Sequence, residues 1–344
     1  MNRRTIPQAL GAAIAMDILI LDHQYAVRCV SEGIGLCIQT VIPALFPFFV
    51  LSSILAASLN RLPKVFLRLF RIDSCGGSIL LTGLLGGYPV GAKNISEAYR
   101  AGHLSKAEAE RLLPICNQCG PAFIFGMTAA LFSDIKQCFM LWEIQLVSVL
   151  LMAWIIPPRE TSHENLLDCK PISWSEALHR AIRAMASVCG WIILFRLLIR
   201  FVQRWLLWRL PLPYQITVSG LLELTNGCTA LHQIADDNLR FALCAVFTCF
   251  GGICVTMQSY SVLHSDLNRT YYFPGKLLQV SLVILLVSLA QQNMYPMTWI
   301  AIPTTIGFLL FFRKSKKTVA FSNNVIYNSS IKDTRKLLCS LEKR

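Results

Sequence analysis

Apolar residues dominate this chain in long runs, and short polar segments separate the runs. Runs of this kind predict membrane-spanning helices, which take about 20 apolar residues each. The predicted spans cover residues 33–59, 135–156, 181–198, 277–290 and 297–312. An earlier run over 6–21 follows Arg3 and Arg4. It predicts a short first transmembrane helix in which Asp17 faces protein or the membrane interface.

Glycine and proline interrupt two apolar segments of the first half, over residues 74–92 and 112–132. Broken backbone inside a bilayer is tolerated only where protein buries its polar groups or where it lines a watery cavity. The two segments therefore predict discontinuous helices, which either cross the membrane or re-enter on the side from which they came. The candidate binding residues at these breaks are Gly86, Gly87, Tyr88, Pro89, Gly91, Lys93, Asn117, Gly120 and Pro121.

A second pair of interrupted segments follows in the same order, over residues 210–234 and 238–263. Discontinuous segments in corresponding positions of two halves are the best sequence indication of a transport site. The pattern therefore predicts two weakly repeated halves around one midplane site. The candidate binding residues in the second half are Glu223, Thr225, Asn226, Gly227, Gly251, Gly252 and Gln258.

Glu223 is the strongest candidate for a functional residue, because it is a carboxylate inside an apolar run. Burying such a group without a partner is expensive, so its presence indicates function. It could hold a cation, accept a proton or bind donor groups of a solute. The structural alternative is a pair with an arginine or an exposed helix end. Glycines at the breaks let backbone amides and carbonyls approach a ligand closely, and half-helix N-termini favour anionic groups.

Pro43 and Pro47 lie inside the predicted span at 33–59, and the polar residues 25–32 before it predict an interfacial stretch. Proline removes a helical hydrogen bond and clashes with the preceding turn, so a kink is expected at these positions. Either a bent packing helix or a hinge beside the broken segments would explain it.

Two polar segments flank the first break. Residues 61–72 carry cations spaced by three to four and predict a basic amphipathic helix in the interface, on the cytoplasmic side. Residues 94–114 predict a helical hairpin with charges of both signs in water. Ser105 and Glu108 have the spacing of a capping box at the start of its second helix.

Arg196, Arg200 and Arg204 share one helical face, because they are spaced by four residues. An arginine at the bilayer centre costs about 2.5–3.5 kcal/mol on insertion scales. The expected arrangement is therefore a span over 181–198 that continues into a basic interfacial extension.

The composition supports a membrane protein, since 54% of the residues are hydrophobic and only 15% are charged. Soluble domains are nearer 25% charged. The net charge of +13 does not indicate nucleic-acid binding, because the basic residues stand at the ends of apolar runs, where they anchor helices in lipid. Membrane lipids are therefore expected partners, and nucleic acid is not.

Chemistry-bearing motifs are sparse. Most of the thirteen cysteines lie in apolar runs, where cysteine packs as a small apolar residue, so no disulfide is expected. Cys116 and Cys119 form a CxxC pair, but no second pair and no histidine at ligand spacing accompany it. Neither a metal nor a cofactor is expected, and no catalytic constellation predicts an enzyme.

Three blocks resemble one known family. They are GLLGGYPVGAK at 83–93, GHLSKAEAERLL at 102–113 and NQCGPAFIFG at 117–126. They resemble the sporulation integral membrane proteins of the YlbJ type, which carry the "nucleoside recognition" or Gate domain. GLLELTNG and FGGICVTMQ resemble the later signature of that family, and the resemblance covers about residues 35–313. Cys119 departs from the pattern, since a serine or similar small polar residue is expected before Gly-Pro.

The resemblance implies a bacterial protein of the cell membrane that is needed in spore formation, and the domain name suggests a nucleoside-like solute by analogy. The predicted fold is an all-α polytopic membrane protein with two weakly repeated halves, each with discontinuous or re-entrant helices. The predicted parts are a membrane half at 1–157, a polar linker at 158–173, a second half at 174–313 and a basic tail at 314–344.

The architecture predicts a permease that moves or binds a small polar solute at a midplane site. The alternative is a non-transporting membrane scaffold or signalling protein required for spore formation. A permease needs a polar-lined midplane cavity, and a scaffold does not.

Overall fold

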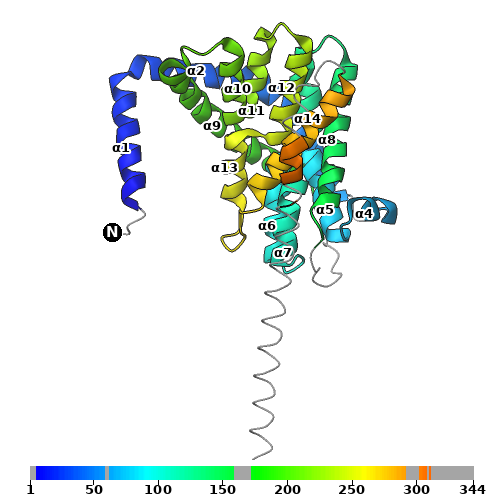
Figure 1. Cartoon of the computed structure of the whole chain (residues 1–344). Coiled ribbons are helices and arrows are strands. Elements are labelled where there is room, and N and C mark those ends of the chain that lie inside the picture. The colour runs from blue at the N-terminus through cyan, green and yellow to red at the C-terminus, as the bar shows by residue number, and fades with distance from the viewer. Residues whose placement is uncertain (1–4, 59–61, 159–171, 292–301, 308–309, 311–344) are drawn as a thin grey trace, which may run out of the picture.

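The computed structural model describes residues 5–58, 62–158, 172–291, 302–307 and 310. These residues form fourteen α-helices, α1 to α14, joined by short π- and 3-10 segments (Figure 1), which confirms the all-α prediction. Most of the predicted span at 297–312, the polar linker and the basic tail lie outside the described residues.

Five helical stretches are long and apolar enough to cross a membrane. They are His23–Leu55, Ile135–Ile155, Trp174–Leu207, Asp237–Val262 and Tyr272–Ala290. Three shorter apolar helical stretches accompany them, Ala9–Leu21, Ser74–Gly86 and Ala122–Leu131. The described part of the chain therefore has the lengths and composition of a multi-pass membrane protein.

The N-terminal helices differ from the prediction in one respect. Helix α1 (Thr5–Leu21) stands apart from the bundle in Figure 1, and Asp17 is exposed, so it does not face protein and its predicted place at the membrane interface stays a prediction. Helix α2 (His23–Leu36) continues through a π segment into α3 (Ile42–Ser58), so the residues predicted to be interfacial belong to one helical run. Hydrogen bonds hold this run against α9, since the Tyr25 hydroxyl donates to the Arg200 carbonyl and Arg196 donates to Glu32. The local sequence does not reveal these distant partners.

The π segment, Cys37–Val41, ends just before Pro43. Pro47 lies inside α3. Because proline cannot donate the helical hydrogen bond, the helix departs from regular α geometry here, as the sequence predicts.

The first interrupted segment begins after a short basic helix. Helix α4 (Lys64–Phe70) is shorter than predicted because Arg71 adopts a left-handed conformation, with φ of 54°, and ends it. Helix α5 (Ser74–Gly86) starts with the Asp73 carboxylate capping the Gly76 amide at 2.7 Å. After a break, α6 (Val90–Arg100) follows.

The hairpin of α6 and α7 (Lys106–Cys116) is solvated only in part, because the turn and one face of α6 are exposed while most of α7 is buried. Ser105 caps α7 through the Glu108 amide, as expected, but the side chains of Glu108 and Arg111 are 1% and 2% exposed. Arg111 donates to Glu108 and to the carbonyls of Ile156, Ala153 and Arg71. Helix α7 is buried because these partners come from distant segments that the local charge pattern does not show.

The second interrupted segment continues from α7 through residues 117–121 into a π segment, Ala122–Met127, and a 3-10 turn, Thr128–Leu131. Helix α8 (Ile135–Ile155) follows as a full span. Non-helical backbone, a π segment and a 3-10 turn separate Cys116 from Ile135, so this segment is discontinuous, as the sequence predicts.

The second half contains the other two interruptions. Its elements are α9 (Trp174–Val202) with a π extension Gln203–Leu207, α10 (Leu212–Leu222), α11 (Leu224–Ala230), α12 (Asp237–Phe250), α13 (Gly252–Val262) and α14 (Tyr272–Ala290). Glu223 separates α10 from α11, and Gly251 separates α12 from α13. Both interruptions fall where the sequence predicts them.

The tips of the interrupted helices meet inside the bundle. Side chains on Gly83 or Gly91 would collide with the Cys116 carbonyl, so α5, α6 and α7 pack in backbone contact there. In the second half, Gly220 and Gly227 bring α10 and α11 together in the same way. Figure 1 places α10 and α11 at one end of the bundle and α6 and α7 at the opposite end.

Candidate functional site

A cavity of about 50 Å³ lies where the broken segments meet. It is lined by Leu45, Phe49, Gly86, Gly87, Tyr88, Cys119, Gly120, Ala122, Phe123, Val188, Ile192, Glu223, Leu224, Thr225, Val255 and Gln258. All four interrupted segments contribute to this wall. The two long helical runs that contain α3 and α9 close it with apolar side chains.

The first two breaks form one side of the cavity. Gly87 has a φ of 72°, a conformation that glycine adopts without strain, and it lies in backbone contact with Gly120. This approach places the backbone of the α5–α6 break directly against the break that follows α7. Tyr88, which is 8% exposed, extends from it into the cavity wall.

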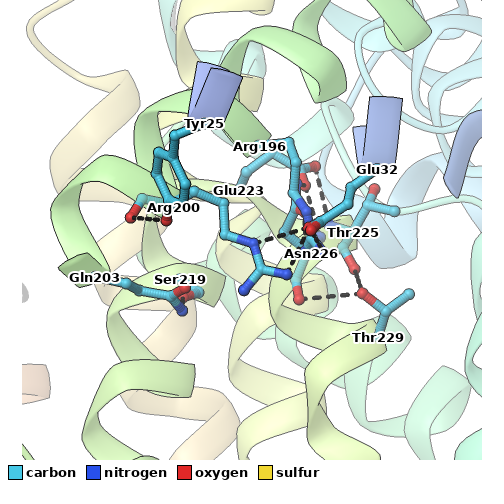
Figure 2. Close-up of polar contacts among 10 residues, drawn as sticks. All are labelled: Tyr25, Glu32, Arg196, Arg200, Gln203, Ser219, Glu223, Thr225, Asn226 and Thr229. Atoms are coloured by element: carbon cyan, nitrogen blue, oxygen red, sulfur yellow. Dashed lines mark hydrogen bonds and ion pairs between the residues drawn. The ribbon is translucent and has the colours of Figure 1, made fainter. Parts of the chain in front are cut away.

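Glu223 forms the opposite side and is 2% exposed. Its extended backbone, with φ of −149°, joins α10 to α11, and its carboxylate caps α11. The carboxylate accepts from the amides of Thr225 at 2.9 Å and Asn226 at 2.7 Å, and from the Asn226 side chain at 2.7 Å (Figure 2). Backbone amides therefore stabilise the charge, as expected of a helix N-terminus.

A polar chain connects Glu223 to the helices behind it. Arg196 donates to the Asn226 side-chain oxygen at 2.9 Å and to the Glu32 carboxylate at 3.0 Å, and Arg200 donates to Glu32 at 2.9 Å (Figure 2). The structural alternative predicted for Glu223 was a direct pair with an arginine or an exposed helix end. The structure has neither, because Asn226 stands between Glu223 and Arg196 and the carboxylate is buried.

The remaining break, between α12 and α13, packs against both Tyr88 and Glu223. Gly251 and Gly252 have φ of 79° and 81°. A side chain on Gly251 would meet the Tyr88 ring at 3.2 Å, and one on Gly252 would meet the Leu222 carbonyl at 3.1 Å. This break therefore touches both sides of the cavity and permits no side chain at its apex.

The structure brings seven of the predicted site residues into the cavity wall. They are Gly86, Gly87, Tyr88, Gly120, Glu223, Thr225 and Gln258. Five others adjoin the lining residues in the chain or pack on them, namely Pro89, Pro121, Asn226, Gly251 and Gly252, and the Gly227 amide donates to the backbone carbonyl of Glu223. The prediction that a solute binds to these residues stays a prediction.

The other three predicted residues lie elsewhere. Gly91 packs against the Cys116 carbonyl. Lys93 is exposed and lies 3.8 Å from Glu97. Asn117 donates to Ser259 at 2.7 Å and to Tyr272 at 2.9 Å, and thus connects the α7 break to α13 and α14. The buried positions of Gly91 and Asn117 support a packing role for these two residues.

Sequence reasoning missed Lys276, which is 0% exposed near the start of α14. Its ammonium donates to the Tyr88 hydroxyl at 3.0 Å and to Gln279 at 2.9 Å. The signal was present, because Lys276 and Gln279 are three residues apart and therefore share one helical face. A lysine at the start of an apolar run is, however, also the pattern of an interfacial anchor.

The cavity wall combines apolar side chains with one carboxylate, an amide, hydroxyl groups and backbone. Within the described ranges no three His, Cys, Asp or Glu side chains gather as metal ligands. The eleven described cysteines are all free.

The interrupted helices and apolar spans define a multi-pass integral membrane protein. Its sequence is 25% identical over 327 residues to the sporulation integral membrane protein YlbJ of Bacillus subtilis (strain 168), with 80% of each chain covered. The chain is thus a distant homologue of that protein, which confirms the family-level resemblance predicted from its motifs. No family model matches the chain, and no solved structure matches it.

Proposed function

We propose that this chain is a permease that moves a small polar solute through the cavity between its four interrupted segments, and that it is not an enzyme. The observation that carries the proposal is the lining itself. Gly87, Gly120 and Glu223, each from a different interrupted segment, line one cavity. Broken backbone at membrane depth belongs where it lines a cavity.

We further propose that the halves form an inverted repeat. Arg71, just before α5, bonds to the Trp154 carbonyl at the end of α8, and the Tyr99 ring near the end of α6 contacts His264 at 5.6 Å. Both ends of α5–α6 therefore belong to the end of the bundle where Arg111 bonds α8, and the pair would re-enter there. Helices α10 and α11 would re-enter from the opposite end.

The crossing segments support the same proposal. The segment from α7 to Leu131 starts near Asn268, whose amide donates to Glu110 at 2.8 Å, and finishes near Arg240 at the start of α12. The α12–α13 segment runs the other way, from Arg240 to His264. Inverted repeats of this kind place a substrate near the midplane and open it to each side in turn.

The domain name in the family resemblance suggests a nucleoside-like solute, and the cavity wall supplies groups that suit one. Tyr88 and Phe123 offer aromatic surface, and Glu223, Thr225 and Gln258 are polar. The name of the Bacillus subtilis relative refers to sporulation. We propose the same process for this chain.

Thiol accessibility tests the permease proposal. Thr225→Cys would be introduced into the otherwise native protein, and oriented vesicles would be treated on either side with a membrane-impermeant methanethiosulfonate reagent. Mass spectrometry of the peptide that contains residue 225 would give the labelling rate. We expect labelling from at least one side, and slower labelling in the presence of uridine as the probe nucleoside.

Thr128→Cys is the matched control, since Thr128 is 0% exposed but does not line the cavity, and it should stay unlabelled. If residue 225 is also inert from both sides, the cavity is a sealed packing defect and the scaffold alternative replaces the permease. If it is labelled and uridine has no effect, a nucleoside-like solute is rejected and the permease remains.

A further inference from the structure

We propose that Lys276 is the proton-binding residue that couples the permease cycle to protons, by acting as a resident cation in a cradle of neutral oxygens. This inference rests on the proposed function and names its coupling ion. The cradle is formed by the Tyr88 hydroxyl, the side-chain oxygens of Gln118 and Gln279, and the Cys249 carbonyl.

The geometry of the cradle is that of a site for a small cation. The four oxygens lie 2.9–3.4 Å from the Lys276 nitrogen, whereas an ammonium has three protons to donate. No carboxylate of the described part of the chain contributes. Lys276 is 0% exposed, and a buried charge without a counter-charge is costly. The cradle alone therefore stabilises the ammonium.

The cradle joins three of the four interruptions. Tyr88 belongs to the α5–α6 break, Gln118 to the break after α7, and Cys249 to the last turn of α12 before Gly251. Lys276, on α14, donates hydrogen bonds to all three of these residues. Protonation or deprotonation of Lys276 therefore changes the hydrogen bonding of three interruptions at once.

Tyr88 carries this effect into the cavity. With Lys276 charged, the Tyr88 hydroxyl accepts from the ammonium, while its own proton goes to the carbonyl of Thr248 at 3.1 Å or Cys249 at 3.0 Å. A neutral amine has a lone pair and can accept from Tyr88 instead. Loss of the proton would thus reverse the hydrogen bond and release Tyr88, which lines the cavity, from the end of α12.

Few other groups near Lys276 could gain or lose the coupling proton. The titratable groups facing it are the Tyr88 phenol and the thiols of Cys119 and Cys249. Helix α8 contributes only neutral groups here, since Ser148 bonds to Gln279 at 3.1 Å. Protonation at this cluster is therefore assigned to the amine.

The test measures the labelling rate of Thr225→Cys from neutral to alkaline pH, divided by the rate of a free thiol at the same pH because the reagent reacts with the thiolate, with sodium chloride exchanged for choline chloride at constant ionic strength. We expect the rate to change by about tenfold with pH, which corresponds to a coupling of about 1.4 kcal/mol, and to be independent of sodium. Adding Lys276→Met should abolish the pH dependence. Adding Lys276→Arg should fix the rate at its value for the protonated protein.

Lys106→Met, at an exposed position of α7, is the control and should keep the full pH profile. If the Lys276 variants do not fold, Tyr88→Phe gives a second test, since it keeps the ring but lacks the hydroxyl and should also remove the pH dependence. A wild-type pH profile in Lys276→Met or in Tyr88→Phe, or a rate that follows sodium, overturns the inference and leaves the permease standing. Absence of labelling at every pH removes the proposed function itself.

Discussion

The carboxylate of Glu108 lies 2.6 Å from the guanidinium of Arg111, and both side chains are buried at the junction of α7 with the end of α8. The same guanidinium donates to the carbonyls of Ile156 and Ala153, which α8 leaves unpaired at its C-terminus. One arginine thus caps a membrane-spanning helix and fixes the helical hairpin against it.

The first prediction concerns this pair. Glu108→Gln should destabilise the protein by about 3–5 kcal/mol, because it leaves the Arg111 charge buried without its partner. Thermal unfolding in detergent would measure the change. Glu97→Gln is the control, since its pair with Lys93 is exposed and should contribute less than about 1 kcal/mol. Equal effects of the two substitutions would contradict the burial of the pair.

The second prediction separates a helix cap from a cavity residue. Glu223 and Asp236 each cap a helix by accepting from two backbone amides, but only Glu223 lines the cavity. Replacing either by alanine should cost about 0.5–2 kcal/mol in unfolding free energy. Only Glu223→Ala should change the labelling of a cysteine placed at Gln258. A labelling change of the same size in Asp236→Ala would show that loss of the cap alone explains the effect.

The third prediction compares two glycines with the same backbone conformation. Gly251 and Gly102 have φ of 79° and 77°, and a side chain on Gly102 meets nothing within 4 Å. Gly102→Ala should therefore cost only the left-handed strain, about 1–2 kcal/mol. Gly251→Ala should cost about 1–3 kcal/mol more, because its methyl group presses on Tyr88 and Val255. Unfolding temperatures that fall equally would argue against close contact at the α12–α13 break.

The fourth prediction concerns packing at the α5–α6 break. Gly91→Ala should strongly destabilise the protein or prevent folding, because the methyl group would collide with the Cys116 carbonyl. Gly190→Ala, in the middle of α9 with open space around it, should instead stabilise the helix by about 0.5–1 kcal/mol. Monodispersity in detergent and unfolding temperature would report both. A tolerated Gly91→Ala would require the α6–α7 contact to be looser than the structure has it.

The interrupted helices were predictable because their causes are local. Gly87 and Pro89 at the first break, Gly120 at the second and Gly251 at the last break the helices whatever surrounds them. Glu223 was also recognisable, because a carboxylate stands out in an apolar run. These signals were sufficient to place seven of the sixteen residues that line the cavity.

The rest depended on partners far along the chain. The local sequence predicts that Arg111 is a solvated residue of the hairpin. Its guanidinium instead donates to the carbonyls of Arg71 and Ile156, which are 40 and 45 positions away in the chain. Arg196 bonds to Glu32 across 164 positions. Hydrophobic periodicity and charge spacing describe one face of a single helix. They cannot reveal which other helix supplies the hydrogen-bond and ion-pair partners of that face.

The separation of Tyr88 from Lys276 by 188 positions has a consequence for biogenesis. The ribosome delivers the α5–α6 tip to the membrane long before it synthesises α14. Until α14 inserts, Tyr88 and Gln118 have no ammonium between them, and the early segments cannot close around their final partner. Completion of the central cluster is therefore a late step of membrane assembly, and a nascent chain that stops before α14 lacks the residue that bonds to Tyr88, Gln118 and Cys249 together.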